Sequence, residues 1–269
     1  MKILSYFIVS IFFIFSFSSC SNQSSKQLQA SVEANQELEK LRQDSIKKIE
    51  TKRAEFIEDS LKRIELQKQL IEKKEAEKKA YFDNLEDSTM VELIKYDSSL
   101  VLDIRYATEN NFMKQKVYPC PKALLRKVAA IALFDANQKF KKQGYTIKIY
   151  DGYRPLSVQW ILWNTTTNKN YVANPRRGSN HNKGCAVDMT LVDAEGNELN
   201  MGTGYDFFGK EAHHTYKNFP ADTKDEILKN RKTLKTIMES VGFKSISNEW
   251  WHYDFKIKYP VSDTPLPCE

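Results

Sequence analysis

The sequence predicts an α+β domain that follows a long helical stalk. Residues 21–118 contain no glycine and no proline, and Lys, Glu, Gln, Arg and Ala dominate up to about residue 85. All 9 glycines, all 8 prolines and all 4 tryptophans come later in the chain. We therefore divide it into a signal segment (1–20), a stalk (21–89) and a folded domain with a central antiparallel sheet (90–269).

The first segment, MKILSYFIVSIFFIFSFSSC, has the pattern of an export signal. One lysine precedes about fifteen apolar or small residues, a run too short to span a membrane comfortably. The ending Ser18-Ser19-Cys20 resembles a bacterial lipoprotein signal, in which the cysteine becomes the lipid-bearing first residue, although Phe17 stands where such signals usually carry Leu. An uncleaved anchor helix and a plain secretory signal are the alternatives. In each case we expect an exported protein, facing the periplasm or the cell exterior.

The stalk favours helix at nearly every position. Its apolar residues recur at spacings of three, four and seven: Leu38, Leu41, Ile46, Ile49, Phe56, Ile57, Leu61, Ile64 and Ile71. The heptad shifts phase near Ile49 and is broken at Lys68, so a short coiled coil, through which stalks self-associate, and a solvated single helix both remain open. About sixty helical residues would span about 90 Å. We expect the stalk to hold the domain away from the lipid and to do no chemistry.

Local periodicity predicts the first elements of the domain. Residues 91–108 favour short strands, and residues 122–144 favour an amphipathic helix that ends at Gly144. Residues 145–155 read as a buried strand that runs into a turn, and residues 157–167 as a second helix.

Three further elements complete the predicted domain. Residues 184–202 favour a hairpin of two strands around Glu195-Gly196-Asn197. A helix is predicted over residues 224–241, with Gly242 as its stop signal, and residues 247–257 favour a final strand.

Charge and cysteine content limit the partners and the cross-links. The 41 Lys+Arg against 35 Asp+Glu are spread along the chain, so we expect no nucleic-acid partner. Export permits disulfides, and Cys120 and Cys268 are candidates for one, but the sequence does not show whether their α-carbons come close enough. Cys185 is more simply a small buried thiol.

The chain has only 4 histidines, and one of them lies in SNHNKGCAVD, seven residues before an aspartate. A hydrolytic zinc site needs three ligands from His, Asp or Glu and an open position for water. His181, Asp188 and His252 could supply them, with Glu249 as general base. A bend or bulge would have to bring Glu249 and His252 to one cavity. Each histidine alone is more often structural, but a carboxylate on an apolar run, as at Asp188, needs compensation.

The motifs resemble a known family. SNHNKGCAVD fits Ser-x-His-x-x-Gly-x-Ala-x-Asp and EWWH fits Glu-x-x-His, as in the zinc D-alanyl-D-alanine peptidases, which share a fold with the hedgehog signalling domain. The blocks DIRYATENNF, DGYRP, MGTGYDFF and EAHHTY resemble the dipeptidase branch, which cleaves free D-Ala-D-Ala. The resemblance covers about residues 92–258 and excludes the stalk. It implies one zinc ion per chain, held by His181, Asp188 and His252, with Glu249 as the catalytic base.

The same resemblance implies roles for four more residues. Arg154 matches an arginine that stabilises the oxyanion of the attacked carbonyl, and a salt bridge that braces the DGYRP turn is the alternative. Ser179 matches a residue that binds the substrate carboxylate, and Asp206 one that binds its free ammonium group. Tyr106 matches a position whose backbone lines the pocket while its side chain packs. A fixed anion at one end of a pocket and donors at the other would select a dipeptide.

The other aromatic residues and histidines of these blocks have simpler interpretations. We expect a place in the core for Phe207, Phe208, Trp160 and Trp163, and a structural or pocket-shaping role for His213 and His214.

The expected function is zinc-dependent hydrolysis of D-Ala-D-Ala in cell-wall peptide turnover. One alternative is a D,D-carboxypeptidase that trims peptidoglycan stem peptides, which suits a long stalk but not Asp206. Another is a non-catalytic wall-binding module, which the complete set of catalytic groups opposes. Free D-Ala-D-Ala is made in the cytoplasm, so export favours recycling or nutrition over antibiotic resistance.

Overall fold

The computed structural model describes the backbone of residues 4–268 and the side chains of residues 25–268. The chain divides into two compact units, one ending at Ala76 and the next beginning at Glu77. The side chains of the predicted signal segment, with the predicted lipidation site Cys20, lie outside the described residues. Among the residues described, no helix is long and apolar enough to cross a membrane.

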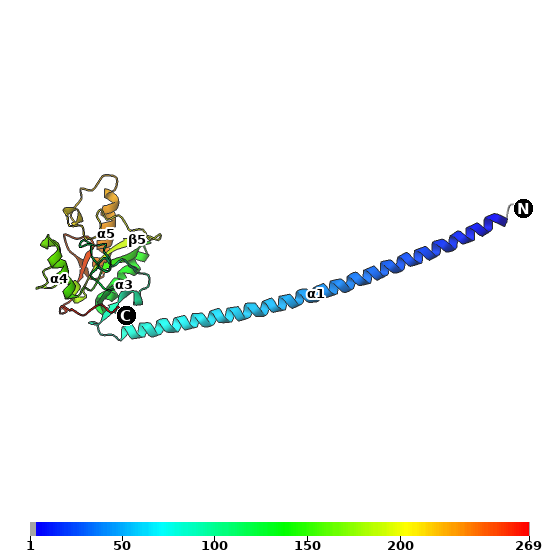
Figure 1. Cartoon of the computed structure of the whole chain (residues 1–269), viewed down its shortest axis with the longest axis horizontal. Coiled ribbons are helices and arrows are strands. Elements are labelled where there is room, and N and C mark those ends of the chain that lie inside the picture. The colour runs from blue at the N-terminus through cyan, green and yellow to red at the C-terminus, as the bar shows by residue number, and fades with distance from the viewer. Residues whose placement is uncertain (1–3, 269) are drawn as a thin grey trace. The chain divides into compact units, whose positions relative to one another are not determined.

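A single helix, α1 (Leu4–Asp83), contains the predicted stalk except for its last six residues (Figure 1). Its sequence has neither glycine nor proline, so no residue interrupts the backbone hydrogen bonds. Oppositely charged side chains pair four positions apart, as Lys62 does with Glu58 at 2.7 Å. The apolar side chains are exposed: Leu61 is 60% and Ile64 63% accessible. Among the described residues, these apolar side chains of the stalk are therefore left accessible to water.

The second unit is built on a five-stranded sheet of order β2-β4-β5-β7-β6. The strands are β2 (Val101–Leu102), β4 (Thr146–Asp151), β5 (Ala186–Val192), β7 (His252–Phe255) and β6 (Phe243–Ser245). Neighbours are antiparallel except β2 and β4. All seven residues of β5 are buried, which explains why this strand reads as an almost continuous apolar run.

Figure 1 shows the helices α3, α4 and α5 in the same unit as β5. The helices of this unit are α2 (Leu93–Tyr96), α3 (Lys127–Lys141), α4 (Leu156–Thr165) and α5 (Lys224–Ser240), with 3₁₀ turns η1 (Arg105–Ala107), η2 (Lys169–Tyr171), η3 (His181–Lys183) and η4 (Lys210–Ala212). The α3 and α5 helices pack against each other and against the sheet. The prediction of an α+β fold with antiparallel strands is confirmed.

Three local predictions were wrong. Residues 93–96 form helix α2 instead of strand. The expected start of the next helix is strand β3 (Leu124–Arg126), which pairs with β1 (Met90–Glu92). The second strand of the predicted hairpin is reduced to one bridge between Val192 and Glu198. In the second case the pairing partner lies more than thirty positions away, which local periodicity does not show.

A disulfide closes the second unit. Cys120 and Cys268 are bonded, with their α-carbons 5.7 Å apart. Cys185 is free and buried. The C-terminal segment reaches this bond along the domain: the Ser262 N–H donates to the carbonyl of Asn182, and the Leu156 N–H donates to the carbonyl of Ser262.

Candidate active site

Strand pairing brings the three predicted metal ligands together. In the antiparallel register of β5 and β7, Asp188 lies directly opposite His252. His181 opens the turn η3, and Gly184 then leads the chain into β5 with a left-handed φ of 69°. A Cβ at Gly184 would lie 2.5 Å from the side chain of Met90, so a larger residue would disturb this approach.

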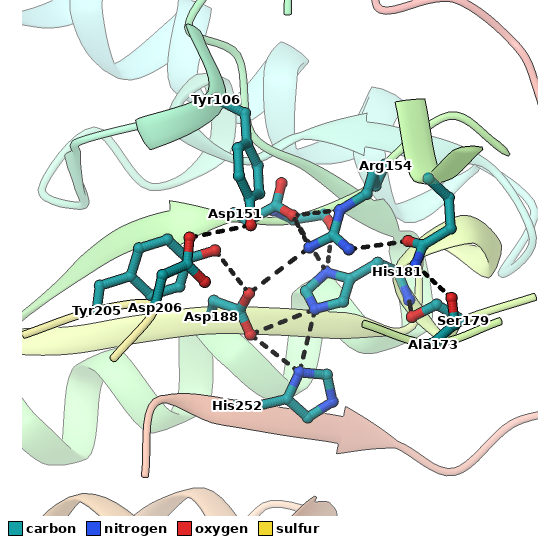
Figure 2. Close-up of polar contacts among 12 residues, drawn as sticks. Tyr106, Asp151, Arg154, Ala173, Ser179, His181, Asp188, Tyr205, Asp206 and His252 are labelled. Atoms are coloured by element: carbon teal, nitrogen blue, oxygen red, sulfur yellow. Dashed lines mark hydrogen bonds and ion pairs between the residues drawn. The ribbon is translucent and has the colours of Figure 1, made fainter. Parts of the chain in front are cut away.

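The inner atoms of these residues face one another (Figure 2). His252 Nδ1 lies 2.9 Å and His181 Nε2 3.3 Å from Asp188 Oδ1, and the two nitrogens are 3.1 Å apart. Atoms bound at about 2.0–2.1 Å to a tetrahedral zinc ion lie about 3.3 Å from one another. All three residues are buried, and two imidazoles with one carboxylate are a donor set typical of catalytic zinc. The residues therefore fit a metal ion.

Each histidine is oriented by a partner on its outer nitrogen. His181 Nδ1 lies 2.7 Å from the carbonyl oxygen of Gly152, and His252 Nε2 lies 2.8 Å from Asp254 Oδ1. Both partners accept a hydrogen bond, which leaves the inner nitrogen of each ring with a lone pair for a metal. The sequence interpretation missed Asp254. Its signal was its position two residues after His252 on a strand, which places both side chains on one face.

Asp188 stays ionised although it is buried. Burial raises its pKa, but the neighbouring His181 and His252 outweigh burial and hold the pKa well below its usual range. The Tyr205 hydroxyl donates to the outer oxygen of Asp188 at 3.0 Å. Tyr205 was also missed by the sequence interpretation, and the block GYDFF gave no sign that this tyrosine reaches a metal ligand.

Glu249 lines the same cavity as the three ligands. The chain turns through Trp250 and Trp251 before β7 begins, and the His252 N–H lies 3.4 Å from the Glu249 carbonyl oxygen. A tight turn, not a bulge, therefore separates the acid from the histidine. Burial, the largest effect, raises the pKa of Glu249 to about 7, and Asp188 adds to the rise while His252 opposes it. A carboxyl group with such a pKa suits proton transfer near neutrality.

Arg154 combines the two roles considered for it. Its Nε and Nη2 donate to Asp151 Oδ2 at 2.9 and 2.6 Å, and its Nη1 donates to Gln159 at 2.8 Å. This salt bridge braces the turn after β4. The guanidinium also lines the cavity, and Nη2 is 3.9 Å from Asp188 Oδ2. Three of its five N–H groups are thus occupied, and two remain for a ligand.

The predicted substrate-binding residues line the cavity as well. Ser179 Oγ accepts a hydrogen bond from the His181 N–H at 3.2 Å. Asp206 accepts a hydrogen bond from the Tyr106 hydroxyl at 3.1 Å. The side chain of Tyr106 therefore contacts a predicted substrate-binding residue, whereas it was expected only to pack. Burial, followed by the charge of Asp188, raises the pKa of Asp206 well above its usual range. Asp206 is therefore a half-buried carboxyl group, and among the described residues no cation forms an ion pair with it.

Aromatic rings form a further part of the cavity wall, which encloses about 620 Å³. Phe208 stacks on Tyr171 at 4.8 Å and contacts Phe112 at 5.1 Å between ring centroids. The prediction of a core position was wrong for Phe207 and Trp160, which are 43% and 37% exposed.

The remaining histidines, His213 and His214, do not join the metal ligands. The Arg231 guanidinium donates to the backbone carbonyl of His213. Burial lowers the pKa of His214 to about 4, and its Nε2 has no hydrogen-bond partner among the described residues.

The sequence profile of the M15 peptidases, described as D-ala-D-ala dipeptidase, matches residues 87–266. The chain belongs to this family. This M15 peptidase is thus a metallopeptidase, and the family resemblance inferred from SNHNKGCAVD and EWWH is confirmed.

Relatives of this M15 peptidase align over most of their own length. A D-alanyl-D-alanine dipeptidase of Escherichia coli K12 is 33% identical over 68% of this chain and 95% of its own length. A D-alanyl-D-alanine dipeptidase of Enterococcus faecalis V583 is 33% identical over 60% of this chain and 88% of its own length. Among solved structures, the LdcB LD-carboxypeptidase covers 64% of this chain and 70% of its own, at 22% identity and a TM-score of 0.36, a likeness too weak to support a conclusion here.

Proposed function

We propose that this M15 peptidase hydrolyses D-Ala-D-Ala to two D-alanines with one zinc ion per chain. The observation that carries the proposal is the convergence of His181, Asp188 and His252 on one cavity that Glu249 also lines. The relatives named as D-alanyl-D-alanine dipeptidases support the choice of substrate.

The bound zinc would polarise a water molecule and the peptide carbonyl at His181, Asp188 and His252. Glu249 accepts the proton of the attacking water on its carboxylate and returns it to the nitrogen of the leaving D-alanine. Burial raises the pKa of this carboxyl group to about 7 in the metal-free site, which favours its role as a group that both accepts and returns a proton.

Arg154 stabilises the negative charge that develops on the carbonyl oxygen. Asp151 and Gln159 fix its guanidinium plane before substrate arrives, so no reorganisation is needed during the reaction. The N–H groups of Nη1 and Nη2 that no described residue occupies are then available as donors to that oxygen.

Two side chains hold the ends of the dipeptide. Asp206 pairs with the free ammonium group, which supplies a cation for this half-buried carboxyl group. Ser179 binds the carboxylate at the other end, near His181. Because both charges of a dipeptide are met by fixed groups, the cavity selects for length as well as for chemistry.

Hydrolysis by the purified protein tests the proposal. Zinc content and release of D-alanine would be measured with D-Ala-D-Ala, an L,D-dipeptide and a stem pentapeptide, for wild type and Glu249→Ala. We expect zinc near one per chain, preference for D-Ala-D-Ala, and loss of turnover in the variant. Substantial turnover by Glu249→Ala would contradict the mechanism, and preference for the pentapeptide would indicate a carboxypeptidase.

We further propose that the protein is exported and anchored through lipid on Cys20, where it serves cell-wall peptide turnover. The lipoprotein-like ending Ser18-Ser19-Cys20 supports the anchor. Labelling cells with a fatty-acid probe tests it: wild type should carry the label and sediment with membranes, whereas Cys20→Ala should lose the label. Equal labelling of both proteins would contradict the proposal.

We also propose that two stalks associate as a short coiled coil. The exposed apolar side chains of α1, among them Leu61 and Ile64, support this, because a partner helix would remove them from water. Analytical ultracentrifugation of residues 21–269 should give a dimer that Leu61→Glu/Ile64→Glu converts to a monomer. A monomeric wild type at high micromolar concentration would contradict it.

A further inference from the structure

The segment Met201–His213, called the amine loop below, places two consecutive side chains in the active site. Tyr205 donates to the metal-ligand candidate Asp188, and Asp206 accepts from Tyr106 (Figure 2). On an extended backbone, two successive side chains would point to opposite sides. The backbone is not extended at Asp206, which has a left-handed φ of 57°, an uncommon conformation for a residue other than glycine. The surrounding structure must therefore hold the loop in this conformation.

Arg231 holds both ends of the amine loop. This arginine lies on α5 and is 4% exposed. Its Nε donates to the carbonyl of Met201 at 2.7 Å, at the start of the loop. Its Nη2 and Nη1 donate to the carbonyls of Glu211 and His213 at 2.9 and 3.0 Å, at the end of the loop. One rigid guanidinium thus joins two backbone segments that lie ten or more residues apart in the sequence.

Arg231 is buried without an acidic partner. Among the described residues, its hydrogen bonds go to the three backbone carbonyls and no carboxylate forms an ion pair with it. The rings of Phe219 and Trp250 lie 4.9 and 5.9 Å from the guanidinium carbon. Burying an unpaired cation is costly, and an apolar side chain would fill the same space at less cost. A planar fork that can bind three carbonyls at fixed angles is what an arginine adds here.

A second contact ties the amine loop to the segment that carries the general base. Trp250 Nε1 donates to Thr203 Oγ1 at 2.7 Å, and the Trp250 N–H donates to the carbonyl of Ala212 at 3.1 Å. Trp250 directly follows Glu249. The positions of Asp206 and Glu249 are therefore set by one connected framework.

We propose that Arg231 is a positioning residue for recognition of the substrate's free amino group. By clamping the amine loop it keeps Asp206 where the ammonium group of a dipeptide arrives. This inference rests on the proposed function, because it takes the ligand of Asp206 to be that ammonium group. A carboxylate that moved by a fraction of an ångström would lose much of its selectivity for the amine.

The test compares two ligands that differ only in the amino group. D-Ala-D-Ala is used as substrate and N-propionyl-D-alanine, the same dipeptide without the amine, as competitive inhibitor. The variants are Arg231→Met, Arg231→Lys and, as control, Lys232→Met, which removes an exposed charge from the next position of α5. We expect Arg231→Met to lower kcat/KM at least about tenfold, mainly through KM, because a charge-assisted contact is weakened. The inhibition constant of N-propionyl-D-alanine should change by less than about threefold, since it does not use Asp206.

Arg231→Lys should fall between wild type and Arg231→Met, because it keeps the charge but not the planar fork, and Lys232→Met should match wild type. An equal loss of affinity for both ligands would overturn the proposal and leave Arg231 with a merely structural role. If Arg231→Met does not fold, Arg231→Lys and Thr203→Val, which removes the other anchor, carry the same comparison. A change in selectivity supports the proposal, and its absence in both variants overturns it.

Hydrogen exchange gives a readout independent of turnover. Without any ligand, peptides that cover the amine loop should exchange faster in Arg231→Met than in wild type or Lys232→Met. Unchanged exchange would overturn the proposal that Arg231 holds the amine loop in place. A wild-type protein that exchanges as expected but does not hydrolyse D-Ala-D-Ala would instead contradict the proposed function.

Discussion

Replacing Glu249 with glutamine is expected to stabilise the metal-free protein at neutral and higher pH. Burial raises the pKa of Glu249 from 4.5 to about 7, so ionising this side chain is harder in the folded than in the unfolded protein. At 1.36 kcal/mol per pH unit, the difference corresponds to about 3 kcal/mol of folding free energy. Glutamine has a similar shape and stays neutral, so the variant does not bear this cost.

The sign follows from proton binding. Between pH 4.5 and about 7 the folded protein holds the Glu249 proton more tightly than the unfolded chain, so the free energy of unfolding falls as the pH rises. Glu249→Gln should therefore exceed wild type by about 1 kcal/mol at pH 5 and by about 3 kcal/mol at pH 8. Urea denaturation in the presence of a chelator at these pH values measures the difference.

Parallel stability curves for the two proteins between pH 5 and pH 8 would refute this reasoning, because they would show that Glu249 titrates as an ordinary carboxyl group. Glu195→Gln is the matched control, since Glu195 lies on an exposed turn. Metal is removed throughout so that its charge does not act on Glu249.

Three further predictions concern the metal, the disulfide and the amine site. Asp254→Ala removes the acceptor on His252 Nε2 and should weaken zinc binding by about 10–100-fold in a chelator competition; unchanged affinity would contradict an orienting role. Cys120→Ser/Cys268→Ser opens a cross-link between residues 148 positions apart and should lower the free energy of unfolding by about 5 kcal/mol on the chain-entropy estimate, whereas a loss below about 1 kcal/mol in urea denaturation would contradict it. Dipeptide binding to Glu249→Gln at a pH below the raised pKa of Asp206 should release up to about one proton, because the ammonium group favours the ionised carboxylate. Calorimetry in buffers of different ionisation enthalpy measures this release, and Asp206→Asn should abolish it.

Local sequence patterns were sufficient to predict those helices and strands whose own residues determine their structure. The helical spacing of residues 224–241 corresponds to α5, and the apolar run before residue 192 corresponds to β5, because each pattern reflects burial of one element against the core. The pairing of β1 with β3 was not predictable in this way. It joins Val91 to Leu125 across the chain, and neither segment alone reveals its partner.

In the candidate site, too, some residues were predictable from local sequence and others depend on the tertiary fold. His181, Asp188, His252 and Glu249 were singled out by residue type and spacing, since few side chains can bind zinc or move a proton. Their supporting groups carry no such signature. The Gly152 carbonyl contacts His181 only through the tertiary fold, and Asp254 and Tyr205 are common residue types whose hydrogen-bond partners are chosen by strand register and loop path.

Two features of the sheet determine whether this chemistry is possible at all. The register of β5 and β7 sets Asp188 opposite His252, and a shift by one residue would turn one of them to the other face of the sheet. The irregularity in β4 between Ile149 and Asp151 places Asp151 opposite Asp188 as well, so that the anchor of Arg154 lies beside the metal ligands. Asp151 anchors Arg154, and the carbonyl of the next residue, Gly152, orients His181. The end of β4 therefore supports both the group that would stabilise the carbonyl charge and one of the proposed metal ligands.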